Sequence, residues 1–260
     1  MLALCGGLTW AQGSSVSSSD SAGTVVAAYT ISQGVAQPDP GVSVAAGKRR
    51  SYDLVEIYVW KALPPDVKPL VSRLELFVST STAADATDGT ATENDDGATW
   101  TLALDAKEGE SAVIGRKLTD RQVFDEVIAH EIGHVISLNE SQRASDSQPA
   151  GYTDQDGPFT LSAYLSRFYA RFWRGQDAQG TSGDSADPAS ARYDENPDAF
   201  VTEYAATDPS EDFAESFAYF VLDPAPTGTT VKDRKIQFFY HFPDLVKDRG
   251  YLRSGLSSSR

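Results

Sequence analysis

Residues 119–138 read TDRQVFDEVIAHEIGHVISL, and this stretch decides the fold that we expect for the chain. Its apolar side chains recur at the spacing of one helix face: Phe124, Val127, Ile128, Val135 and Leu138. Thr119 and Gln122 match a capping box, in which both side chains bond free backbone N–H groups at the start of a helix. The stretch therefore predicts a helix over residues 120–138.

The middle of this predicted helix carries the pattern H-E-x-x-H, as HEIGH over residues 130–134. Residues four apart on a helix share a face, so His130 and His134 can direct both imidazoles at one metal ion. Glu131 projects about 100° round the helix from His130, which allows it to hold a water beside that ion. Two of the three histidines in the chain fall in these five residues, which argues against coincidence. The pattern predicts a zinc site in which Glu131 accepts a proton from water.

A catalytic zinc normally has three protein ligands and one open position, so a third ligand is needed. Glu140 stands where the longer signature H-E-x-x-H-x-x-G-x-x-H places its last ligand. That signature requires a glycine where Ser137 stands and a methionine below the site, whereas the only methionine is Met1. His241 lies in the aromatic run FFYHF, which favours a packed or surface position. Neither Glu140 nor His241 is the favoured third ligand.

The favoured third ligand is Glu211, in the stretch PSEDFAESF over residues 209–217. Asp208 followed by proline predicts the start of a helix. Three phenylalanines of that helix are expected to point inward: Phe213, Phe217 and Phe220. Glu211 and Glu215 are four apart, so the first can bind zinc while the second accepts the other N–H of a ligand histidine. The alternative is that Glu211 completes a capping box with Asp208.

The two stretches, HEIGH and YAATDPSEDFAESF, resemble the gluzincin peptidases, particularly the anthrax lethal-factor catalytic domain and the Pro-Pro endopeptidases. The resemblance covers about residues 100–222. It implies one zinc ion per chain, with Glu131 as the general base. It also implies the zinc ligands: His130, His134 and Glu211.

The resemblance assigns roles to two more side chains. Tyr204 stands seven residues before Glu211, where these peptidases place a tyrosine that donates a hydrogen bond to the oxyanion. Glu215 would orient a ligand histidine, His130. A strand at the cleft edge pairs with the substrate backbone in such enzymes, and residues 99–105 are the expected strand. The gap from His134 to Glu211 is longer than in these peptidases, so the resemblance does not extend to substrate preference.

The rest of the chain predicts an α+β fold, because strands come first and helices follow. Alternating apolar residues predict three strands: 51–60, 73–79 and 99–105. Helical spacing predicts further helices: 160–174, one beginning at Asp208, 232–240 and 243–247. Two polar stretches are expected to be loops: 83–97 and 175–198. We expect a zincin-like metallopeptidase domain over residues 48–256, with a small mixed or antiparallel sheet packed on the H-E-x-x-H helix and a mainly helical C-terminal part.

The N-terminal residues predict export. Residues 1–11 are mostly apolar and resemble the remnant of a signal peptide, and residues 12–47 are expected to form a flexible linker. Lipid attachment at Cys5, the only cysteine, is an alternative, although Leu4 is bulky for the position before a lipidated cysteine. We therefore expect a secreted or cell-envelope protein.

The composition limits the classes of partner that the protein is expected to bind. A formal net charge of −15 argues against binding nucleic acid or an anionic membrane surface. No apolar run approaches the roughly 20 residues of a membrane-spanning helix. The expected function is a zinc endopeptidase acting on a peptide or protein. The alternatives are a zinc amidase acting on a non-peptide or cell-wall substrate and a non-catalytic binding module, and the oligomeric state stays open.

Overall fold

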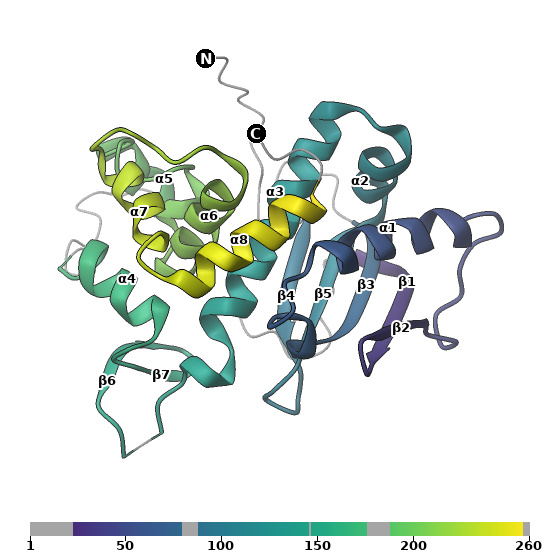
Figure 1. Ribbon diagram of the computed structural model, residues 1–260, viewed down its shortest axis with the longest axis horizontal. Helices are drawn as coiled ribbons and strands as arrows, with labels where there is room; N and C mark the ends of the chain where they lie inside the picture. The colour runs from purple at the N-terminus through teal and green to yellow at the C-terminus, as the bar shows by residue number, and fades with distance from the viewer. Residues whose placement is uncertain (1–22, 80–87, 146, 176–187, 257–260) are drawn as a thin grey trace.

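The computed structural model describes residues 23–79, 88–145, 147–175 and 188–256. Helix α3 (Leu118–Leu138) runs between a sheet on one side and a group of C-terminal helices on the other (Figure 1).

Among the described residues, the larger sheet contains five strands in the order β2-β1-β3-β5-β4. Their bounds are β1 (Gly23–Ser32), β2 (Val35–Pro38), β3 (Val71–Ser79), β4 (Gly89–Glu93) and β5 (Trp100–Asp105). Strands β3 and β5 are parallel, and the other neighbouring pairs are antiparallel. The predicted α+β class with a small mixed sheet is confirmed.

Strand β5 lies inside the sheet, because it pairs with β3 on one side and with β4 on the other. The prediction that residues 99–105 form the strand at the cleft edge is therefore wrong, and β4 is the edge strand next to β5 among the described residues. The prediction of a loop over residues 83–97 is wrong for 89–93. This segment, GTATE, lacks apolar alternation because an edge strand of short side chains is held by its backbone pairing with β5.

Part of the predicted linker is also a strand. Residues 12–47 were expected to be flexible, but β1 and β2 form an antiparallel pair at the other end of the sheet. Strand β1 pairs with β3 and contributes to the core, where three of its residues are buried: Ala27, Ala28 and Tyr29. Residues 23–32 and 35–38 therefore belong to the same sheet as β3. The expected signal-peptide remnant, residues 1–11, lies outside the described residues.

The segment predicted as a strand over residues 51–60 is instead helix α1 (Arg49–Ala62). The alternation of Val55, Ile57 and Val59 suggested a strand, but Ile57 is 55% exposed. The side chains that are buried follow helical spacing: Tyr52, Val55, Val59 and Ala62. Helix α1 crosses one face of the sheet (Figure 1) and meets α3 through a hydrogen bond from the Tyr58 hydroxyl to Asp125.

The prediction of helix α3 is confirmed, but the helix begins earlier than expected. It begins at Leu118, and its N-cap, Lys117, has no side-chain cap. The predicted capping box at Thr119 is wrong, because Thr119 lies inside the first turn and its hydroxyl contacts Asp120. Before α3 come the short helix α2 (Ala106–Glu110) and a π-helical turn at Ser111–Gly115.

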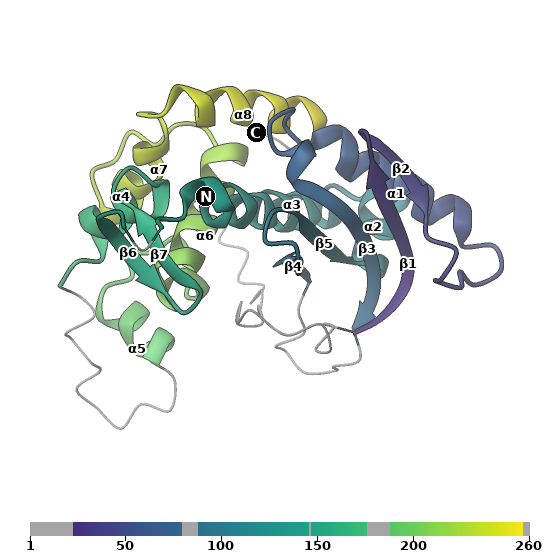
Figure 2. The ribbon, with the colours of Figure 1, turned by 90° about the horizontal axis from the view of Figure 1, so that it is seen from below.

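The C-terminal half is mainly helical, as expected. It contains α4 (Tyr164–Phe172), α5 (Pro188–Glu195), α6 (Pro209–Leu222), α7 (Val231–Phe239) and α8 (Pro243–Gly255). Helix α5 was not predicted, because it falls in a polar stretch expected to be a loop. The hairpin of β6 (Ala150–Asp154) and β7 (Gly157–Thr160) lies with α4 across α3 from the sheet (Figure 2).

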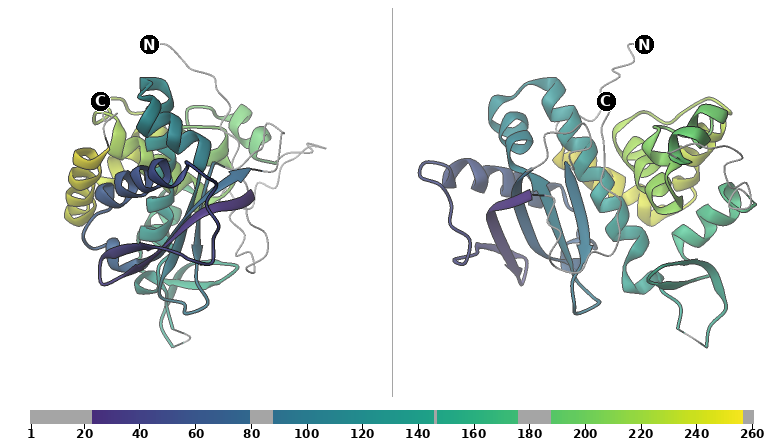
Figure 3. Two further views of the ribbon diagram at one scale, coloured as in Figure 1. Left: turned by 90° about the vertical axis from the view of Figure 1, so that its right-hand side faces the viewer. Right: turned by 180° about the vertical axis from the view of Figure 1, so that it is seen from behind.

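Aromatic side chains from α4, α6 and α7 form the core of this half. Around Phe239, at ring-centroid distances of up to 6.2 Å, lie Phe168, Phe213, Phe217 and Phe220. The helices form a group beside the sheet (Figure 3), and α8 contacts both α6 and α1. Within the described part of the chain, no helix combines the length and apolarity that a membrane span requires.

Candidate metal site

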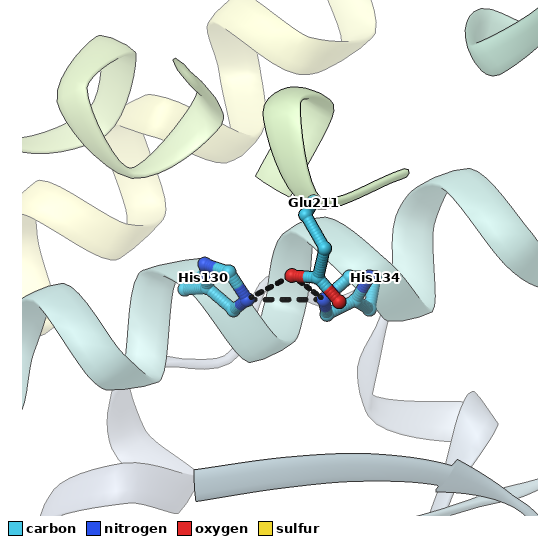
Figure 4. Close-up of side chains that lie close together, drawn as sticks. All are labelled: His130, His134 and Glu211. Atoms are coloured by element: carbon cyan, nitrogen blue, oxygen red, sulfur yellow. Dashed lines mark hydrogen bonds and ion pairs between the residues drawn. The ribbon is translucent and has the colours of Figure 1, made fainter. Parts of the chain in front are cut away.

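Three buried side chains from α3 and α6 converge on one point (Figure 4). The Nε2 atoms of His130 and His134 lie 3.0 Å apart. Glu211 reaches toward them from the first turn of α6, and its Oε2 lies 3.2 Å from each Nε2. His130 and Glu211 are each 2% exposed, and His134 is 8% exposed. The two sequence stretches, 77 positions apart from His134 to Glu211, thus meet as predicted.

This triangle has the size that a tetrahedral zinc ion requires. Zinc–nitrogen and zinc–carboxylate bonds of ~2.0–2.1 Å place neighbouring ligand atoms ~3.3–3.4 Å apart at the corners of a tetrahedron. The observed separations of 3.0–3.2 Å are close to that value. Two imidazole nitrogens that face each other also repel unless a proton or a cation lies between them. The residues present therefore fit a bound metal ion.

The electrostatics of the site favour positive charge beside Glu211. Burial opposes the charged form of His130, but hydrogen bonds to Glu211 and Glu215 outweigh it and raise the His130 pKa well above its ordinary value. Burial also disfavours the Glu211 carboxylate, but the charge of His134 and hydrogen bonds from both histidines lower its pKa. This charge comes either from histidine protons or from a divalent cation, which displaces them on binding.

Asp208 explains how Glu211 is directed inward. The Asp208 side chain caps α6 by accepting hydrogen bonds from the backbone N–H groups of Ser210 and Glu211. The first turn is therefore capped without the Glu211 side chain. The alternative that Glu211 completes a capping box is wrong, because its carboxylate faces the two histidines.

Glu215 lies one turn further along α6 and holds the other side of His130. The His130 Nδ1–H donates to Glu215 Oε1 at 2.8 Å, as the sequence predicted. The second carboxylate oxygen, Oε2, accepts a hydrogen bond of 2.6 Å from the Thr202 hydroxyl. Thr202 was missed, because one threonine in an irregular segment has no periodicity that marks it.

Glu131 of α3 is 3% exposed, and its side chain lies against Gly89, the first residue of β4. A Cβ built on Gly89 would come 3.0 Å from Glu131 Oε1 and 2.6 Å from Val127 Cγ1. A glycine is therefore required where the edge strand passes Glu131. Burial raises the pKa of the Glu131 carboxyl, and the charges of His130 and His134 partly offset that effect.

Tyr204 borders the same site from the 3-10 turn Tyr204–Ala206. Its ring centroid lies 6.0 Å from that of His130, and its hydroxyl is hydrogen-bonded to Glu211. Burial, followed by the charges of Glu211 and Glu131, raises the Tyr204 pKa well above its ordinary value. The phenol therefore keeps its proton and acts as a hydrogen-bond donor, here to Glu211.

The two rejected ligand candidates lie elsewhere. Glu140 is exposed in the turn Glu140–Gln142 after α3. His241 follows α7, where its Nδ1 lies 3.1 Å from the carbonyl oxygen of Gln237. Among the described residues, only His130, His134 and Glu211 form a group able to hold a metal ion.

Comparison with protein-family models, with curated proteins and with solved structures finds no match for this chain.

Proposed function

We propose that this protein is a zinc-dependent endopeptidase with a zincin-like, gluzincin-type domain. The observation that carries the proposal is the buried triangle of ligand atoms beside the buried Glu131 carboxylate. Three side chains would hold one zinc ion: His130, His134 and Glu211. Such an ion would act as a Lewis acid and lower the pKa of a water at its open position.

Glu131 is the proposed general base. Its carboxylate is buried and interacts electrostatically with His130, His134 and Glu211, so it is placed to accept a proton from water and return it to the leaving amine. The charges of His130 and His134 favour its ionised form and so oppose the effect of burial. The net effect raises the Glu131 pKa, toward the range in which a general base can both accept and return a proton.

Tyr204 is the proposed donor to the oxyanion. Its phenol lies at the edge of the site and retains its proton, so it can donate a hydrogen bond to negative charge that develops on the carbonyl oxygen. A preorganised donor of this kind stabilises the transition state more than the ground state.

Strand β4 favours a peptide as the substrate. An extended peptide can pair with the backbone of a strand at a sheet edge, and β4 is an edge strand among the described residues. Its first residue, Gly89, lies against Glu131, so a peptide paired with β4 would pass the proposed base.

The test is Glu131→Gln, with Glu140→Gln as the matched control on the exposed turn after α3. We expect about one zinc per chain in both variants. Turnover on a peptide library should fall by about 10²–10⁴-fold for Glu131→Gln, the usual contribution of a general base, and stay unchanged for Glu140→Gln. Equal turnover in the two variants would contradict the role of Glu131.

The same assay separates the alternative functions. Cleavage of peptidoglycan fragments without cleavage of any peptide would indicate a zinc amidase. Zinc and peptide binding with no hydrolysis of either substrate would indicate a binding module. Both outcomes would reject the endopeptidase.

A further inference from the structure

The Thr202 hydroxyl is the last member of a hydrogen-bonded chain that begins at His130. His130 Nδ1 donates to Glu215 Oε1 at 2.8 Å, and Glu215 Oε2 accepts from Thr202 Oγ1 at 2.6 Å. Thr202 Oγ1 in turn accepts from the backbone N–H of Ala205 at 3.1 Å. Both oxygens of the carboxylate and the hydroxyl group are thus fixed by partners in the fold.

The direction of each hydrogen bond in this chain is determined. A carboxylate accepts, so the proton between His130 and Glu215 belongs to Nδ1, and Nε2 is the nitrogen that faces Glu211 and would bind a metal ion. The Ala205 N–H can only donate, so the Thr202 hydroxyl directs its own proton at Glu215. Thr202 therefore holds Glu215 in the rotamer that orients the His130 ring toward Glu211.

Thr202 also holds the turn that carries Tyr204. Residues 204–206 form a 3-10 turn, and the bond from Ala205 N–H ties its start to the Thr202 hydroxyl. Through the bond to Glu215, the same hydroxyl ties this turn to α6. The Thr202 hydroxyl thus contacts both the turn that carries the proposed oxyanion donor and the carboxylate that orients His130.

We propose that Thr202 is a positioning residue that fixes His130, through Glu215, for metal binding and aligns the Tyr204 turn with the metal site. This proposal rests on the proposed function, which identifies the ion as zinc. Partners of this kind, which contact a ligand side chain but not the metal, typically contribute about 10–100-fold in metal affinity or activity.

The experiment compares Thr202→Val, which keeps the shape and loses the hydroxyl, with Thr202→Ser, which keeps the hydroxyl. The matched control is Thr230→Val, because the Thr230 hydroxyl also donates to a carboxylate, Asp233 Oδ2, at 2.6 Å and caps α7. Zinc affinity is measured by competition with a chelator, and the absorption spectrum of the cobalt-substituted protein reports the ligand arrangement. Peptide hydrolysis gives kcat and KM separately.

We expect Thr202→Val to lower zinc affinity by about 10-fold, to change the cobalt spectrum and to lower kcat with little change in KM. Thr202→Ser should restore all three properties. Thr230→Val should lower only the free energy of unfolding, because it removes the cap of α7. If Thr202→Val matches the parent in zinc affinity and cobalt spectrum, the positioning role is rejected.

The outcomes also separate this proposal from the proposed function. If the parent binds zinc but cleaves no peptide, the endopeptidase is rejected, and the affinity and spectral comparisons still decide the role of Thr202. If the parent cleaves peptides and Thr202→Val behaves as the parent does, only the Thr202 proposal fails. A parent that binds no zinc rejects both.

Discussion

Gly133 of α3 lies directly against Ala214 of α6. A Cβ built on Gly133 would come within 3.0 Å of the Ala214 Cα and 3.4 Å of its Cβ. The glycine within HEIGH therefore sets how closely the two helices approach. Because Glu211 lies three residues before Ala214 on α6, this approach also sets the distance from Glu211 to the two histidines.

The first prediction follows from that contact. Gly133→Ala should push α6 away from α3, lower the free energy of unfolding by about 1–3 kcal/mol and weaken zinc binding. The control is Gly250→Ala on α8, where an added Cβ meets nothing within 4 Å. That change should stabilise the protein by about 0.5–1 kcal/mol, because alanine is the better helix former. Urea unfolding and zinc titration measure both effects, and unchanged zinc affinity in Gly133→Ala would contradict the spacing argument.

The second prediction concerns the carboxylate that completes the triangle. Glu211→Ala removes the carboxylate whose Oε2 faces both imidazoles, so zinc affinity should fall at least about 10²-fold. Asp194→Ala, on helix α5, serves as the control and should bind zinc as the parent does. Zinc content after dialysis against a weak chelator distinguishes the two. Full zinc retention in Glu211→Ala would show that another residue is the third ligand.

The third prediction tests the contribution of the Tyr204 hydroxyl to turnover separately from that of its ring. Tyr204→Phe should keep the metal and lose about 10²-fold in turnover, the usual cost of one oxyanion donor. The matched control is Tyr58→Phe, which also loses a hydroxyl bonded to a carboxylate, Asp125, but on the face of α3 that contacts α1. The control should lose stability and keep its turnover per folded molecule. Equal turnover in the two variants would remove Tyr204 from the proposed mechanism.

The fourth prediction concerns a buried ion pair behind the site. Lys235 Nζ lies 2.6 Å from Asp212 Oδ2, both side chains are at most 1% exposed, and Trp173 Nε1 donates to the same carboxylate oxygen at 2.7 Å. Lys235→Met leaves a buried carboxylate without its cation, and should lower the free energy of unfolding by about 3–5 kcal/mol. Adding Asp212→Asn should recover part of that loss, since the remaining pair is neutral. A double variant less stable than Lys235→Met would contradict a dominant charge effect.

The sequence was sufficient to predict the side chains that gather at the site, because helical geometry determines them. Positions 130 and 134 share a face in any helix, and the same holds for 211 and 215. The proline and cap at Asp208 locate the start of α6, so the direction of Glu211 follows. What the pattern could not provide is the partner of Glu215, because Thr202 reaches it through an irregular segment whose path depends on tertiary packing.

The errors in the predicted fold have equally definite causes. In residues 51–60, apolar side chains satisfy both a two-residue and a three-to-four-residue spacing, and only the exposure of Ile57 distinguishes a helix from a strand. Strand β4 has no apolar alternation, because its place in the sheet depends on pairing with β5 and on Gly89 fitting against Glu131. In both segments, tertiary contacts determine the secondary structure, and a single sequence does not reveal those contacts.

The last prediction is a pH dependence of stability that originates away from the metal site. Asp248 of α8 is 3% exposed, and burial together with the neighbouring Asp66 carboxylate raises its pKa from 3.8 to about 7. Between these two pH values the folded protein holds a proton that the unfolded chain has released. The free energy of unfolding should therefore fall as the pH rises from about 4 to about 7, and stay at the lower level above that range.

Asp248→Asn removes this titration. At pH 4 the variant and the parent should be about equally stable, since both side chains are neutral in the fold. At pH 8 the variant should be more stable by on the order of 1–2 kcal/mol, less than the full linkage energy because solvent screens part of the repulsion. Asp95→Asn, at an exposed position, should follow the parent at every pH. Urea unfolding at pH 4, 6 and 8 measures the difference, and parallel curves for Asp248→Asn and the parent would show that Asp248 is ionised in the folded protein throughout.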